Sequence, residues 1–66
     1  MSVAKHVEIS ATSSKSFEDA IQSGIKKTAE SVKGIQGAWI KEQKVIVKGD
    51  DVTEYRVSMK VTFIVK

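Results

Sequence analysis

The chain has 66 residues, with eleven Lys and Arg against eight Asp and Glu, a formal net charge of +3 and no cysteine. The absence of cysteine excludes disulfides and thiolate metal sites, and the single histidine, His6, argues against a zinc site within one chain. We expect one domain spanning residues 1–66, whose isolated core is marginal, so that oligomerisation supplies the missing stability.

The charge and hydropathy patterns exclude several classes of protein. The lysines are spread along the chain, and no basic block indicates a nucleic-acid partner. The longest uninterrupted apolar run has three residues, far short of a membrane span or a secretory signal, so a cytoplasmic protein is expected. No catalytic motif occurs, and His6 has no second catalytic side chain at a meaningful spacing. An enzyme is therefore not expected.

The first predicted element is a short strand at residues 3–10, because Val7 and Ile9 alternate with polar side chains. A polar stretch at residues 11–16 predicts a loop. Ser16, followed three residues later by Asp19, resembles a capping box and predicts the start of a helix. An apolar stripe with helical spacing follows: Phe17, Ala20, Ile21, Gly24, Ile25, Thr28 and Val32. Gly34 is the predicted carboxyl-terminal cap of this helix.

Two further strands are predicted on either side of a turn at residues 48–51, where glycine and aspartate supply the turn chemistry. The last strand alternates most clearly, with Tyr55, Val57, Met59, Val61, Phe63 and Val65 on one face. The preceding strand begins with Ala38 and Ile40 in one phase and ends with Val45 and Val47 in the other. This change predicts a bulge near residues 42–44, or a strand that passes into the packing environment of a neighbouring subunit.

These elements predict an α+β fold of β-α-β-β order, in which one helix packs across one face of a three-stranded antiparallel sheet. The last strand carries more apolar side chains than one short helix can cover. The opposite sheet face is a mixture of apolar and polar side chains: Trp39, Arg56, Ser58, Lys60 and Ile64. Such a mixed face favours contacts with other subunits or with a ligand.

Three segments resemble the dodecin family: residues 7–13 (VEISATS), the helix around Ala20 and Ile21, and residues 54–63 (EYRVSMKVTF). Dodecins are small β-α-β-β proteins that assemble into hollow twelve-subunit spheres and bind flavins. The resemblance covers nearly the whole chain without a gap. It implies a homododecamer that binds and stores a flavin, either riboflavin, FMN or lumichrome, and is a flavoprotein without enzymatic activity.

In flavin-binding dodecins, a tryptophan at the start of the second strand stacks on the isoalloxazine ring, and a glutamine in the third strand bonds the ring edge. These positions correspond here to Gly37 and Arg56. Trp39 follows Gly37 by two residues and is expected on the same face, displaced by roughly 7 Å. The resemblance therefore implies a flavin site made by Trp39, Arg56, Gln43 and Gly37.

Other readings of the same residues stay open. Trp39 is also suited to anchor one subunit against another, and Arg56 to pair with a neighbouring subunit's carboxylate or to clamp a phosphate or carboxylate. Residues 38–43 (AWIKEQ) are similar to a divergent branch described as calcium dodecins. Calcium prefers about six to eight oxygen ligands. The only acidic cluster, Asp50, Asp51 and Glu54, supplies that number only if several copies meet; otherwise it is a solvated turn.

The alternative function is therefore a dodecin-like assembly that binds calcium or another cation, or that serves as a scaffold. A basic accessory protein that touches nucleic acid is the weakest hypothesis, because the lysines are scattered and no aromatic-basic motif accompanies them.

Overall fold

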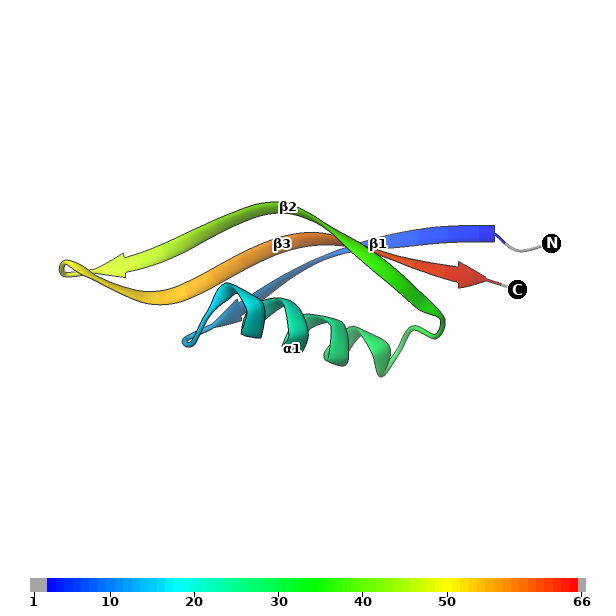
Figure 1. Ribbon diagram of the computed structural model, residues 1–66, viewed down its shortest axis with the longest axis horizontal. Helices are drawn as coiled ribbons and strands as arrows, with labels where there is room; N and C mark the ends of the chain where they lie inside the picture. The colour runs from blue at the N-terminus through cyan, green and yellow to red at the C-terminus, as the bar shows by residue number, and fades with distance from the viewer. Residues whose placement is uncertain (1–2, 66) are drawn as a thin grey trace.

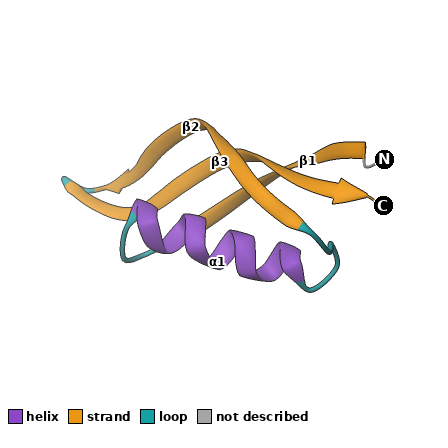
Figure 2. Cartoon of the chain, turned by 45° about the vertical axis from the view of Figure 1, so that its right-hand side comes forward, coloured by secondary structure: helices purple, strands orange, loops and turns teal. Residues whose placement is uncertain are grey.

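The computed structural model describes residues 3–65, which form one helix and one three-stranded sheet (Figure 1). The elements are β1 at Val3–Ser13, α1 at Phe17–Ala29, β2 at Ile35–Lys48 and β3 at Asp51–Val65. The strands are antiparallel and lie in the order β1-β3-β2, and α1 packs across one face of the sheet (Figure 2). The predicted β-α-β-β architecture is confirmed.

β1 is longer than its alternating pattern predicts. Each of its residues from Val3 to Ser13 pairs with β3, and the register has no break. The polar residues at its end, predicted as part of a loop, continue the strand because β3 offers them backbone hydrogen bonds. The sheet therefore extends alongside the start of α1.

The amino terminus of α1 forms as predicted. The Ser16 hydroxyl accepts a hydrogen bond from the Asp19 backbone N–H at 3.0 Å. The buried Ser13 makes two further hydrogen bonds at the helix start. Its hydroxyl donates to the Asp19 carboxylate at 2.6 Å and accepts from the Lys15 N–H at 2.9 Å. These bonds satisfy backbone donors that a helix start otherwise leaves free.

The carboxyl terminus of α1 differs from the prediction. The helix ends at Ala29, about one turn earlier than the stripe to Val32 predicts. Gly34 does have a positive φ of 76°, but it lies in the connection to β2 and does not cap the helix. Its carbonyl accepts from the Ile64 N–H at 3.0 Å, and a Cβ at this position would meet the Ile64 carbonyl at 2.9 Å. Glycine is needed there for the close approach to β3.

No helix within residues 3–65 is long and apolar enough to cross a membrane.

The predicted change of phase in β2 is a bulge. The register between β2 and β3 breaks between Ile40 and Glu42, so Lys41 is the extra residue, just before the predicted position. Because of this break, Ile40 and Val45 both lie on the α1 side of the sheet, opposite Met59 and Tyr55 respectively. Two further register breaks fall between Ile35 and Gly37 and between Ile46 and Val47.

The core between α1 and the sheet is small. Its fully buried side chains are Ala20, Val57, Met59 and Val61. Gly24 allows α1 to approach the sheet closely, since a Cβ there would lie 2.9 Å from the Met59 Cε and 3.0 Å from the Ala11 Cβ. The absence of a side chain at Gly24 therefore sets how closely α1 and the sheet pack.

Gly24→Ala is expected to destabilise the fold, although alanine favours a helix by about 1 kcal/mol over glycine. The new methyl has no room between Met59 and Ala11, and such overpacking costs about 1–3 kcal/mol. Urea unfolding measures the change, with Ser23→Ala at an exposed position of α1 as the control. If Gly24→Ala instead raises the free energy of unfolding, as a Gly-to-Ala substitution on an exposed helix face does, then α1 does not pack on Met59 and Ala11 as closely as described.

The chain is elongated, with extents of 52 × 19 × 14 Å. Its radius of gyration is 13.6 Å, against about 11 Å for a compact domain of this length. The cause is a mismatch of lengths, because the 13 residues of α1 span about 20 Å while the 15 residues of β3 span about 50 Å. The tip of the β2-β3 hairpin projects beyond α1 (Figure 1), and Val45, Val47 and Val52 are exposed there.

Candidate functional site on the open face of the sheet

The face of the sheet opposite α1, which we call the open face, is built by strand register. Paired residues of neighbouring strands point to the same side, and the even-numbered residues of β3 from 54 to 62 alternate with the buried core residues. Four rows cross this face from β1 through β3 to β2: His6, Thr62 and Gly37; Glu8, Lys60 and Trp39; Ser10, Ser58 and Glu42; and Thr12, Arg56 and Lys44.

Trp39 presents its indole ring to solvent on the open face, with 73% of its surface exposed in the single chain. Gly37 lies on the same face, as the spacing of two residues predicts. A Cβ at Gly37 would meet only the Thr62 hydroxyl, at 3.7 Å, so there is free space beside the tryptophan. A large apolar ring that is this exposed is suited to a flat ligand or to another subunit.

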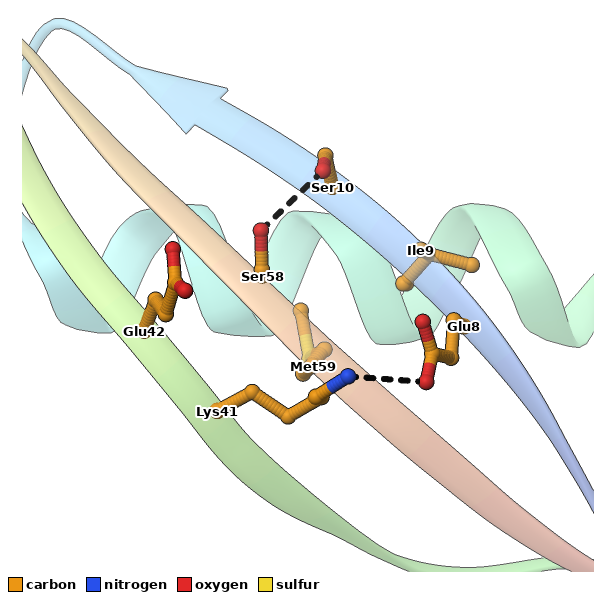
Figure 3. A pocket seen from close by; sticks show the side chains of 7 residues that line it. All are labelled: Glu8, Ile9, Ser10, Lys41, Glu42, Ser58 and Met59. Carbon is orange, nitrogen blue, oxygen red and sulfur yellow. Dashed lines mark hydrogen bonds and ion pairs between the residues drawn. The ribbon is translucent and has the colours of Figure 1, made fainter.

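A shallow trough runs along the open face next to Trp39. One hollow of about 330 Å³ includes Glu8, Lys41, Ser10, Ser58 and Glu42 (Figure 3). A second hollow, of about 230 Å³, shares the last three of these residues and continues to Lys44 and Arg56. The two hollows therefore form one continuous depression, with Trp39 beside the Glu8 end and two cationic side chains at the other.

The Glu8 end of the trough is electrostatically balanced. Lys41, the bulge residue, reaches across β3 and donates to the Glu8 carboxylate at 2.9 Å (Figure 3). This hydrogen bond and the attraction of the same ammonium hold the pKa of Glu8 below its ordinary value of 4.5, with smaller contributions from Lys60 and His6. Glu8 therefore stays ionised, and its charge is compensated by Lys41.

The lowered pKa of Glu8 predicts a pH dependence. Because the folded pKa lies below the unfolded one, the stabilisation is present above about pH 4.5 and is lost as the pH falls through the folded value. Lys41→Gln is expected to lower the melting temperature slightly at pH 7, since the pair is exposed to solvent, and by less at pH 3. Lys48→Gln, which removes an exposed charge at the end of β2, serves as the control. An equal loss for Lys41→Gln at both pH values would contradict the assignment.

The other end of the trough carries an excess of positive charge. Lys44 and Arg56 are directly opposite one another on β2 and β3. Within residues 3–65 the ion pairs are those of Lys41 with Glu8 and of Lys27 with Glu30, and neither includes Lys44 or Arg56. Two hydroxyls lie next along the trough, where Ser10 and Ser58 are hydrogen-bonded to each other at 3.3 Å.

The residues expected to hold a flavin are only partly brought together. Trp39 and Arg56 share the open face, but their rows are four residues apart along β3, which is about 14 Å. Gln43 pairs with the buried Val57 and so lies on the opposite face of the sheet. Ser58, expected on the mixed face of the sheet, lines the trough, as do Glu8, Ser10 and Lys41, which the sequence did not indicate as site residues. Lys41 reaches the trough because it is the bulge residue of β2, and Glu8 and Ser10 reach it through the pairing of β1 with β3.

The three candidate calcium ligands lie at and near the hairpin tip. Asp50 is in the turn, Asp51 begins β3, and Glu54 is opposite Ile46 on the open face. In the part of the chain that the structure describes, no three acidic, histidine or cysteine side chains are grouped closely enough to hold a metal ion. A calcium site at these residues therefore needs oxygen ligands from more than one copy of the chain.

Comparison with known proteins gives a consistent set of similarities. Residues 3–66 match the sequence model of a family described as Dodecin. An Arg-to-Ala variant of the dodecin from Thermus thermophilus superposes with a TM-score of 0.93 at 27% identity, over 100% of this chain and 98% of that chain. The dodecin from Streptomyces davaonensis has the same fold, with a TM-score of 0.92 at 20% identity, over 98% and 96% of the two chains.

A third similar structure comes from Mycobacterium tuberculosis and is described as a calcium dodecin, a calcium-chelating immunodominant antigen with a novel calcium-binding site. It superposes with a TM-score of 0.83 at 30% identity, over 97% of this chain and 91% of that chain. No curated protein sequence matches the chain.

Proposed function

This chain belongs to the dodecin family, and from that premise we propose that it is a subunit of a cytoplasmic homododecameric shell that binds and stores flavin. The ligand is riboflavin, FMN or lumichrome, and the shell carries out no reaction on it. Storage in such a shell lowers the free concentration of a photoreactive molecule and quenches its excited state.

The observation that carries this proposal is the exposed indole of Trp39 on the open face. An isolated soluble chain gains nothing from presenting its one tryptophan to water, whereas a rigid aromatic ring binds a flat heterocycle with little loss of conformational entropy. The space beside Gly37 leaves the neighbourhood of the indole free for such a ring. The donor groups of the trough suit the carbonyls, hydroxyls and phosphate of flavins.

The remaining flavin-site residues have different positions relative to the indole. Arg56 shares the open face with Trp39 and is proposed to contribute polar contacts to the same ligand. Gln43 is on the α1 side of the sheet, so it reaches a ligand on the open face only if a neighbouring subunit presents it. The proposed site is therefore completed by assembly.

The shape of the single chain supports assembly. Apolar side chains at the hairpin tip are uncovered, and a separate apolar hollow of about 440 Å³ lies between α1 and β2. Its lining includes Ile21, Ile25, Ile35, Ala38 and Ile40. A 66-residue chain with so small a core gains most of its missing burial from neighbouring copies.

A fluorescence titration tests the flavin proposal. Purified protein is added to riboflavin, FMN and lumichrome in separate experiments, while flavin and Trp39 emission are recorded together and light scattering measures the mass. Saturable quenching of both emissions on an oligomer is expected, because a stacked ring and indole quench each other. An intact oligomer without quenching of any of the three ligands would contradict flavin binding.

Calcium is the alternative ligand, favoured by the 30% identity to the calcium dodecin. Copies of Asp50, Asp51 and Glu54 gathered around a symmetry axis would supply the oxygens. A site of this kind predicts a melting temperature that rises with Ca²⁺ and falls with a chelator, by about 2.7 kcal/mol of stability at a hundredfold excess over Kd. Asp51→Asn should remove the response to Ca²⁺, while Glu30→Gln at the exposed residue that follows α1 should not. If Ca²⁺ does not raise the melting temperature of the native protein, the calcium function is contradicted and the remaining alternative is a structural scaffold.

A further inference from the structure

The β2-β3 hairpin carries an apolar stripe beyond the part of the sheet that α1 covers. The register break near the hairpin tip skips Thr53 of β3, so β2 keeps its alternation and Val47 follows Val45 on the α1 side of the sheet. Val52 pairs with Val47 and therefore lies on the same side. These three residues, which we call the valine stripe, are exposed because α1 does not extend to the hairpin tip (Figure 1).

A matching apolar surface lies on the same side of the sheet, at the other end of β2. α1 packs on β1 and β3, and this placement leaves an apolar hollow of about 440 Å³ between α1 and β2. Ala38 and Ile40 line the β2 wall of this hollow. Ala38 and Val47 belong to one continuous strand and are about 30 Å apart along it, so the valine stripe cannot reach the hollow of its own chain. The hollow of a second copy is open to it.

The charges beside the two surfaces are opposite in sign. The turn next to the valine stripe carries Asp50 and Asp51, both exposed. The apolar hollow shares Gln36 with a neighbouring hollow that Lys33 and Ile64 line. Within residues 3–65 neither the two aspartates nor Lys33 forms an ion pair. A hairpin tip seated in the apolar hollow of another copy therefore has a cation available for its acidic turn.

We propose that the hairpin tip of one copy docks in the apolar hollow of the next, with the valine stripe between α1 and β2 and the acidic turn against Lys33. The inference rests on the proposed assembly and names the contact that builds it. Two different surfaces meet, so each copy uses its tip on one neighbour and its hollow on another. In a closed shell such head-to-tail contacts return to the first copy and form a ring.

Cysteine cross-linking tests the contact without background, because the native chain has no cysteine. Val47→Cys and Ala38→Cys are combined in one chain, which is assembled under reducing conditions and then oxidised. A disulfide requires Cα atoms about 4.4–6.8 Å apart, so these two sites can be joined only between copies. A denaturing gel without reductant should show covalent oligomers up to the size of one closed ring. Val47→Cys alone, and Val47→Cys with Ser23→Cys at an exposed position of α1, should remain single chains.

A charge exchange tests the polar part of the contact separately. Lys33→Asp is expected to lower the urea concentration at which the oligomer dissociates, because it places like charges together. Adding Asp51→Lys to the same chain should restore the native value. Lys15→Asp, the same change at an exposed position in the loop before α1, should leave it unaltered. A chelator should not dissociate the native oligomer, because Lys33 and not a metal ion compensates the acidic turn.

The outcomes that overturn the docking differ from those that overturn the assembly. An intact oligomer in which Val47→Cys with Ala38→Cys forms no covalent product would contradict the docking and leave the proposed shell standing. A covalent dimer of Val47→Cys alone would show that two tips meet each other instead. Failure of Asp51→Lys to rescue Lys33→Asp would remove the charged part of the contact. A native protein that is monomeric by light scattering would contradict the proposed assembly itself.

Discussion

Trp39→Ala is expected to weaken flavin binding by about 10- to 100-fold, since stacking of a base on an aromatic side chain contributes about 1–3 kcal/mol. The indole is the only large aromatic surface on the open face of residues 3–65, so no neighbouring ring replaces it. Fluorescence titration with FMN measures the loss. Trp39→Phe, which keeps a smaller ring, should have an intermediate affinity.

The same substitution leaves the core of the single chain intact. Trp39 is 73% exposed and is not among the residues that pack on Val57, Met59 and Val61. The light-scattering mass of Trp39→Ala should therefore equal that of the native protein. Loss of the oligomer in Trp39→Ala would make the indole an anchor between subunits, and unchanged FMN affinity would place the flavin elsewhere.

Val47→Asp is expected to prevent assembly, and Val52→Asp should have the same effect. These two valines pair across the hairpin tip and are 55% and 48% exposed in the single chain. On an isolated monomer, substitutions at such positions change stability by less than about 0.5 kcal/mol. If a neighbouring copy covers the tip, each introduced carboxylate is instead buried without a partner, and this cost of several kcal/mol recurs in every subunit.

Light scattering with urea unfolding distinguishes these two cases. The native protein should be large and resist urea, whereas Val47→Asp should be small and unfold at low urea. Lys48→Asp introduces the same carboxylate one residue away at a position that is already polar, and it should retain the assembly. A Val47→Asp protein with native mass and native stability would show that the hairpin tip is solvent-exposed in solution.

Much of the fold follows from short-range patterns. The strict alternation from Tyr55 to Val65 predicts a strand with one buried face, and β3 is the central strand that α1 covers. The Ser16 and Asp19 pair predicts the helix start at the correct residue because capping is a local interaction. The helix end was wrong, because the role of Gly34 depends on Ile64, thirty residues away in the sequence.

The candidate site was less predictable because it depends on register. Placing Trp39 on the face opposite α1 needs only the alternation of a strand. Placing Gln43 requires knowing that the extra residue is Lys41, since a shift of one residue moves every later side chain of β2 to the other face. The hydroxyl pair of Ser10 and Ser58 required the pairing of β1 with β3, which no local pattern contains.

Native mass spectrometry of the purified protein, with and without FMN, tests the central claim most directly. We expect a single assembly with the mass of twelve 7.2 kDa chains, and an increase by whole FMN molecules when the ligand is added. A 7.2 kDa species that remains monomeric and binds no FMN at micromolar concentration would contradict both the shell and the ligand.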